Sequence, residues 1–164
     1  MPPARIHIQA ARRLAFEVVT AFGATKDEHA PNVLRWESDG RLLVEFHTAV
    51  PTLFGGSRRY RTVERVTLVP PERVEFEGVE GPLPLLRDRF TLDEVGGCTD
   101  FTYESTFGLK GWLAGWLLGQ VYVRPLLGRF MRQHVEELKR TVEARAARSH
   151  VYPQPMCMHL DVSP

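Results

Sequence analysis

Two acidic residues, Glu64 and Asp88, stand where a carboxyl group could do chemistry. Each lies in a segment whose side chains alternate between two faces, as in a β-strand, and each falls on the more apolar face. Loss of hydration there would raise the pKa of the carboxyl and suit it to act as a general acid or base, for example in an aldol-type cyclisation or dehydration. Two structural alternatives stay open: a local bulge could turn either carboxyl outward, or an arginine at the sheet edge could pair with it.

Phenol and indole side chains form a second set of candidates. Tyr60 and Tyr103 fall on the inward faces of their segments, and their hydroxyls could orient a ligand carbonyl or bond to nearby backbone. Trp112 and Trp116 could line the mouth of a cavity and stack on a ring or an acyl chain, or they could be ordinary core residues. These residue types suit recognition of a small molecule and do not by themselves indicate catalysis.

Motifs for other kinds of chemistry are missing from the sequence. It has no nucleophile elbow, phosphate-cradling loop or dinucleotide fingerprint, so we expect no cofactor. Residues 156–159 (MCMH) hold soft donor atoms, but we take this short cluster as incidental and expect no metal. A net charge of +1 gives no reason to expect nucleic acid as a partner, and the arginines of 57–61 alternate between two faces.

A sheet and two helices are expected to position these residues. Residues 5–9 and the segments between 33 and 107 alternate as strands, and Ser38-Asp39-Gly40 is typical of a tight hairpin turn. The stretch Ala11 to Phe22 carries the apolar stripe of a helix. A long closing helix is predicted from Gly111 to about Ser149.

The first half of this closing helix is apolar nearly all round. Gly111, Gly115 and Gly119 lie four residues apart, which permits close approach of the sheet, a ligand or a second copy of the chain. A homodimer contact, or contact of this apolar half with a membrane surface, therefore stays open. The sequence has no uncharged run of the roughly 20 residues needed to span a bilayer, so we expect no transmembrane segment.

Length, composition and cysteines suggest the cellular compartment and the domain organisation of the chain. Its 164 residues suit a single domain, and no secretory leader is recognisable at Met1 to Ala10, which predicts a cytoplasmic protein. Cys98 and Cys157 fit no metal or redox spacing, so we expect free thiols. We expect one domain over residues 1–149 and a flexible tail over 150–164, where prolines occur without period.

The order of these elements resembles the helix-grip arrangement of the START-like (SRPBCC) superfamily, which includes polyketide cyclase/dehydrase-type proteins, Bet v 1-like allergens and lipid-transfer domains. The resemblance covers about residues 4 to 148. It rests on the segments 5–11, 38–40, 70–76, 88–92 and 96–103 and on the final helix. It implies an α+β fold in which a curved antiparallel sheet of about seven strands wraps round the C-terminal helix and leaves a cavity. That family has no universal catalytic signature to carry over.

We therefore expect a carrier or sensor that binds a hydrophobic small molecule, such as a lipid, a polyketide or an aromatic compound, between sheet and helix. One alternative is a polyketide cyclase or dehydratase in which Glu64 or Asp88 moves a proton; another is a module that docks a partner protein or a membrane. Whether the chain is an enzyme stays undecided. The expected ligand-binding residues are Val44, Phe46, Tyr60, Thr62, Glu64, Phe76, Asp88, Phe90, Tyr103, Phe107, Trp112 and Trp116.

Overall fold

The computed structural model describes residues 3–24, 30–51, 57–81, 85–108 and 124–152. In this part of the chain the elements are β1 (Ala4–Ile8), α1 (Arg12–Val19), β2 (Asn32–Trp36), β3 (Leu42–Pro51), β4 (Ser57–Val69), β5 (Arg73–Glu80), β6 (Leu85–Val95), β7 (Cys98–Gly108) and α3 (Arg124–Ala146).

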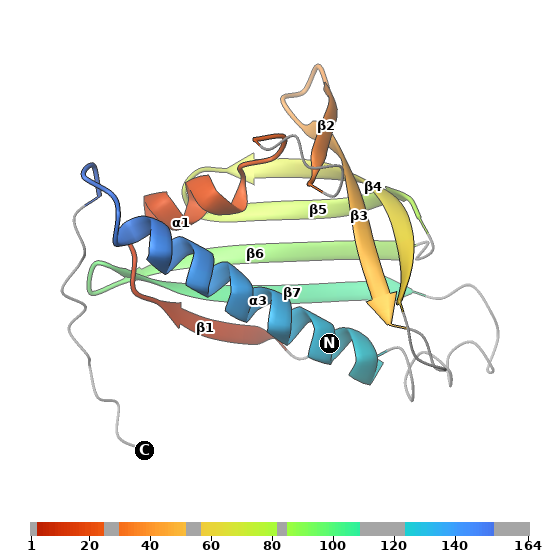
Figure 1. Ribbon diagram of the computed structural model, residues 1–164. Helices are drawn as coiled ribbons and strands as arrows, with labels where there is room; N and C mark the ends of the chain where they lie inside the picture. Colours follow the sequence, from red (N-terminus) through yellow and green to blue (C-terminus); the bar gives the residue numbers. More distant parts are fainter. Residues whose placement is uncertain (1–2, 25–29, 52–56, 82–84, 109–123, 153–164) are drawn as a thin grey trace.

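The seven strands form one antiparallel sheet in the order β1-β7-β6-β5-β4-β3-β2. Figure 1 shows that the sheet is curved and that α1 and α3 lie on the same side of it. The predicted hairpin joins β2 to β3: Gly40 has a φ of 82°, and the Arg41 amide donates to Asp39 Oδ1 at 3.1 Å. The predicted α+β helix-grip class and the count of about seven strands are confirmed.

The inner face of the sheet, which the helices cover, carries the residues that alternation places inward. Strand pairing aligns them in rows across the sheet: Val66 lies opposite Phe76, Phe76 opposite Asp88, and Asp88 opposite Ser105. Because each row runs over four neighbouring strands, a side chain on β4 shares its surroundings with side chains from β5, β6 and β7.

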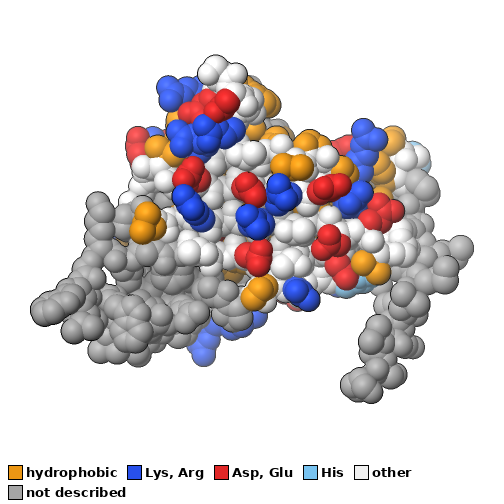
Figure 2. All heavy atoms as spheres, turned by 180° about the vertical axis from the view of Figure 1, so that it is seen from behind, with side chains coloured by type: hydrophobic (Ala, Val, Ile, Leu, Met, Phe, Trp, Pro, Cys, Tyr) orange, Lys and Arg blue, Asp and Glu red, His pale blue; other side chains and the backbone are white. Residues whose placement is uncertain are grey.

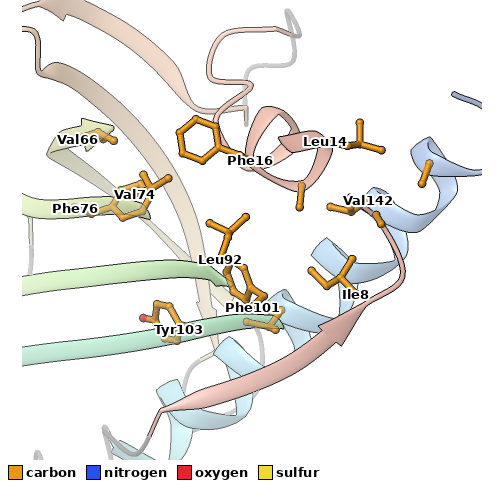
Figure 3. Packing of buried hydrophobic residues seen from close by; sticks show 14 of the residues in the cluster. Ile8, Leu14, Phe16, Val66, Val74, Phe76, Leu92, Phe101, Tyr103 and Val142 are labelled. Atoms are coloured by element: carbon orange, nitrogen blue, oxygen red, sulfur yellow. The ribbon is translucent and has the colours of Figure 1, made fainter. Parts of the chain in front are cut away.

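The packed core occupies the end of this face that lies near α1. Ile8, Leu92, Phe101 and Val142 are completely buried there, and Leu14 of α1 is 2% exposed. Figure 3 shows these side chains converging from β1, β6, β7, α1 and α3, while the Tyr103 hydroxyl points away from them. The other end of the inner face is therefore where a site has to be sought.

The outer face carries charged side chains of alternating sign (Figure 2). Arg61 contacts Glu45 at 2.6 Å and Glu80 at 2.9 Å, and Arg65 contacts Glu37 at 2.7 Å. Further pairs join Arg65 and Arg87 to Glu77, and Arg73 and Arg89 to Glu75. These outer-face arginines are thus paired with glutamates of the same or neighbouring strands.

The two edge strands differ in their cover. α3 lies along β1, where Lys139 Nζ donates to the His7 carbonyl at 2.8 Å and Glu143 accepts from the Gln9 amide at 2.9 Å (Figure 1). At the opposite edge, Leu34 and Trp36 of β2 are 43% and 66% exposed. One edge is thus covered by a helix, while the other keeps exposed apolar side chains.

Three expectations about the rest of the chain have different outcomes. The closing helix is confirmed from Arg124 to Ala146, while its apolar first half, with the glycine row, lies outside the described residues. Cys98 is disulfide-bonded, so the prediction of a free thiol is wrong for it; spacing along a sequence does not report proximity in space. No helix in the described residues is long and apolar enough to span a bilayer.

Candidate functional site

Glu64 is buried on the inner face of β4. Glu64 lies opposite Val44 on β3 and Gly78 on β5, and only 8% of its surface is exposed to solvent. The pairing with β5 shifts between Val63 and Glu64, so a bulge is present, but it leaves the Glu64 carboxyl inside. Thr62 Oγ1 donates to Glu64 Oε1 at 3.1 Å. Burial first, and then the charge of Asp88, raise the pKa of Glu64 to about 7.

Asp88 lies on the same face, two strands away on β6. It is half-buried, opposite Phe76 on β5 and Ser105 on β7. Burial raises the pKa of Asp88, and hydrogen bonds from Ser105 and Tyr103 counteract that rise. Asp88 Oδ1 is buried and has no hydrogen-bond partner.

These surroundings separate the two carboxyls chemically. Hydroxyl donors favour the ionised form of Asp88, whereas Glu64 has one hydroxyl donor and faces the Asp88 charge. Neither forms an ion pair with a cationic side chain of the described segments, so the arginine alternative is not what the structure has there. Near neutral pH the pair can therefore hold a proton on Glu64 beside the charged Asp88.

An aromatic series lies beside this pair on the inner face. Ring centroids are separated by 6.0 Å for Phe22 and Phe46, 6.1 Å for Phe46 and Phe76, and 4.8 Å for Phe76 and Phe90. Phe90 continues the series to Tyr103 at 5.5 Å. We call these five rings the aromatic series. They offer a flat or linear apolar molecule a continuous surface.

Side-chain cover decreases along the inner face. Val66, Val74 and Leu92, near the core, are completely buried. Half-buried side chains follow in the direction of the other strand ends: Phe46, Tyr60, Thr62, Leu86, Asp88 and Phe90. This partial exposure of aromatic and polar groups on a face that helices cover is what an accessible binding surface requires.

The remaining predicted residues have separate outcomes. Val44 is completely buried in the floor of the sheet, and Tyr60 has the Arg58 guanidinium 5.6 Å from its ring centroid. The backbone of Phe107 lies opposite Leu86, but its side chain is outside what is described, as are Trp112 and Trp116.

Sequence reasoning missed three residues of this region. The sequence pattern assigns Phe22 only to the apolar stripe of the first helix. It gives Leu86 and Ser105 no role in a site. Alternation put Leu86 and Ser105 on the right face, so a signal existed for them; the ring contacts of Phe22 are tertiary and left none.

A hollow of about 560 Å³ is formed on the outer face, not the inner one. Arg65, Glu77, Arg87 and Glu104 are among the charged residues that line it. A lining of paired charges does not suit an apolar ligand, so we do not assign the hydrophobic site to it. Within the described segments, no three His, Cys, Asp or Glu side chains are placed to hold a metal ion.

Comparison with known proteins agrees with this geometry. Residues 4–143 match the family described as polyketide cyclase / dehydrase and lipid transport. The chain belongs to this family. The predicted membership of the START-like superfamily is thereby confirmed, and this membership supports hydrophobic ligand binding. No curated protein matches the chain in sequence.

Solved structures show the same fold at low sequence identity. TTHA0849 from Thermus thermophilus is 21% identical, with a TM-score of 0.62 over 90% of this chain and 98% of that one. The Zhui aromatase/cyclase from Streptomyces sp. R1128 is 14% identical, with a TM-score of 0.67 over 87% and 93%. A START superfamily protein from Mycobacterium smegmatis is 13% identical, with a TM-score of 0.54 over 89% and 96%.

Proposed function

We propose that this chain binds a hydrophobic small molecule against the inner face of the sheet, beneath α3, as a carrier or a sensor. The observation that carries the proposal is the aromatic series, in which Phe22, Phe46 and Phe90 are half-buried, with the Glu64 and Asp88 carboxyls beside it. An apolar surface with a few converging polar groups is the usual composition of a small-molecule site. Family membership supports the same class of ligand.

Two neighbouring residues of β6 provide a matched test. Leu86 is half-buried on the inner face beside Gly78, whereas the Arg87 side chain is 75% exposed on the outer face. Leu86→Trp should occupy the site and weaken binding of a hydrophobic fluorescent probe by at least about tenfold, which corresponds to about 1.4 kcal/mol. Arg87→Trp adds the same ring on the other face and should leave the affinity unchanged. Equal probe affinity in both variants would contradict the proposed site.

A cyclase or dehydratase is a second candidate function, favoured by the unequal surroundings of Glu64 and Asp88. On a β-hydroxyketone, the Asp88 carboxylate would take the proton next to the ketone and protonated Glu64 would give its proton to the departing hydroxyl. Water leaves and a carbon–carbon double bond forms. The Zhui neighbour is an aromatase/cyclase by name, which agrees with this candidate.

The catalytic candidate predicts a specific kinetic change. Glu64→Gln should lower kcat for dehydration by about 100-fold, because the acid is lost, while leaving substrate affinity within a few-fold. Glu104→Gln changes a carboxyl on the outer face of β7 and is the control. An unchanged kcat in the Glu64 variant, followed by enone absorbance, would exclude this residue as the acid.

Location and assembly are further proposals. We propose a cytoplasmic protein, a location in which a disulfide such as the one at Cys98 is uncommon. Thiol alkylation after rapid acid quenching would detect a persistent disulfide, which would contradict this location. A homodimer, or docking through the apolar, glycine-bearing residues 111–123, stays a proposal, and light scattering measures the mass in solution.

A further inference from the structure

One buried carboxylate oxygen of the candidate site lacks a hydrogen-bond donor. Asp88 Oδ1 is buried without a partner, while Ser105 and Tyr103 already donate to the same carboxyl group. A buried carboxylate oxygen that accepts nothing is costly. A donor brought in by a ligand would satisfy it, and no described side chain does so.

The charges around the two carboxyls also favour a ligand that brings a hydrogen-bond donor. Among the inward positions of β3 to β7 in the described segments only Arg58 is cationic; it is exposed, lies over Tyr60 and stands six residues along β4 from Glu64. The pKa values of the two carboxyls are shifted by burial, by hydroxyls and, for Glu64, by the charge of Asp88. Other arginines of the same strands lie on the outer face, paired with Glu37, Glu45, Glu75, Glu77 and Glu80. The interior surface beside the two carboxyls is thus negative when Asp88 is ionised, and no cationic side chain of β3 to β7 in the described segments lies beside them to neutralise an anionic ligand.

The apolar part of the site fixes the other end of the ligand. Phe76 and Phe90, with centroids 4.8 Å apart, lie next to Asp88: Phe76 is directly opposite it on β5 and Phe90 is two residues on along β6. A molecule whose ring packs on these faces would bring a substituent to the free oxygen of Asp88. The ring faces also favour a positively charged substituent.

We propose that the ligand is a hydrophobic molecule whose polar head is a hydrogen-bond donor, a hydroxyl or an ammonium group, that pairs with Asp88, and that the site rejects molecules with a carboxylate head. This inference rests on the proposed function. It divides hydrophobic ligands by head group: alcohols, phenols and amines bind, whereas free fatty acids and aromatic acids are excluded.

Four naphthalenes of nearly equal size test this directly on the unmodified protein. They are 2-methylnaphthalene, 2-naphthol, 2-naphthylmethylamine in its ammonium form, and 2-naphthoate, measured at pH 7.5 by displacement of a fluorescent probe. Relative to 2-methylnaphthalene, the naphthol and the ammonium should bind about tenfold tighter, since a hydrogen bond to a charged group stabilises binding by that order. The naphthoate should bind at least about tenfold more weakly.

Two variants locate the discrimination at Asp88. Asp88→Asn keeps the shape and removes the charge, so the ammonium should lose its advantage and the naphthoate should recover. Glu104→Gln removes a carboxyl from the outer face of the adjacent strand and should preserve the order of the wild-type affinities.

The outcomes separate this inference from the proposed function. If 2-methylnaphthalene does not displace the probe and none of the others does, the hydrophobic site itself is wrong. If 2-methylnaphthalene binds but 2-naphthoate binds as tightly or more tightly, the site stands and the inference is overturned. An unchanged preference in Asp88→Asn would overturn the role of that residue.

Discussion

At the scale of single residues, the two inward carboxyls differ in how the fold treats them. Asp88 receives two hydroxyl hydrogen bonds that favour its ionised form, and Glu64 receives one and faces the Asp88 charge. Groups of the same chemical type thus reach different protonation states because of their neighbours. This difference makes the pair usable for either ligand recognition or proton transfer.

The pH dependence of stability reports Glu64. The ordinary pKa of this carboxyl is 4.5, and in the folded chain it is about 7. At pH values between these two, the folded state keeps a proton that the unfolded state has lost. The stabilisation that the protonated group contributes is full below pH 4.5 and is lost as the pH rises to 7. The Glu64→Gln variant has no titrating group at this position. The difference between its free energy of unfolding and that of the wild type should therefore rise by about 3 kcal/mol in favour of the variant from pH 4.5 to pH 7.

Urea unfolding at several pH values measures this difference. Glu104→Gln, on the outer face of β7, should follow the wild type throughout. A constant difference between Glu64→Gln and the wild type would show that the carboxyl is not held protonated by the fold.

The sequence was sufficient to place both carboxyls on the inner face, because strand alternation has a strict period of two. It could not show the bulge beside Glu64, which depends on how Gly78 and Glu80 of β5 pair with β4. Nor could it show which oxygen of Asp88 stays unpaired, since that depends on three strands at once. Patterns give the face of a residue, while partners come from tertiary structure.

At the scale of elements, α3 does more than cover the core. Its residues Lys139 and Glu143 contact the backbone of β1 and its exit, and Val135 and Val142 pack inward from the same helix. Apolar residues at three- and four-residue spacing indicate the packed side of α3. Lys139 and Glu143 lie among its charged residues, so the pattern gives no signal for their backbone contacts.

The contact between Lys139 and His7 can be tested by substitution. Lys139→Met keeps the aliphatic part of the side chain but removes the donor to the His7 carbonyl, which should lower the free energy of unfolding by about 1 kcal/mol. Arg140→Met, at the next and exposed position, is the control and should change stability little. Equal unfolding midpoints in urea for the two variants would mean that the contact contributes nothing.

At the scale of the whole molecule, contacts with the folded core continue past residue 149, where the sequence analysis places the end of the domain. Residues 153–164 lie outside the described part, but Tyr152 packs against the core, and its hydroxyl donates to Glu17 of α1 at 2.5 Å. The Ser149 hydroxyl oxygen accepts hydrogen bonds from the amides of Val151 and Tyr152. We propose that the folded unit extends at least to residue 152.

Truncation places this boundary. Under reducing conditions, a chain that ends at residue 152 should unfold at the same temperature as the full chain. One that ends at residue 149 should lose about 1 to 2 kcal/mol, because the Tyr152 ring and its hydrogen bond are gone. The proposed boundary is wrong if both truncated chains melt together.

The unequal edges of the sheet limit how copies of this protein can grow onto one another. Strand addition needs a free row of backbone groups, and α3 occupies that position along β1, which leaves β2 as the open edge among the described strands. When two copies join through their β2 strands, each has used its open edge. Assembly of this kind therefore closes at two copies and cannot propagate into a fibre.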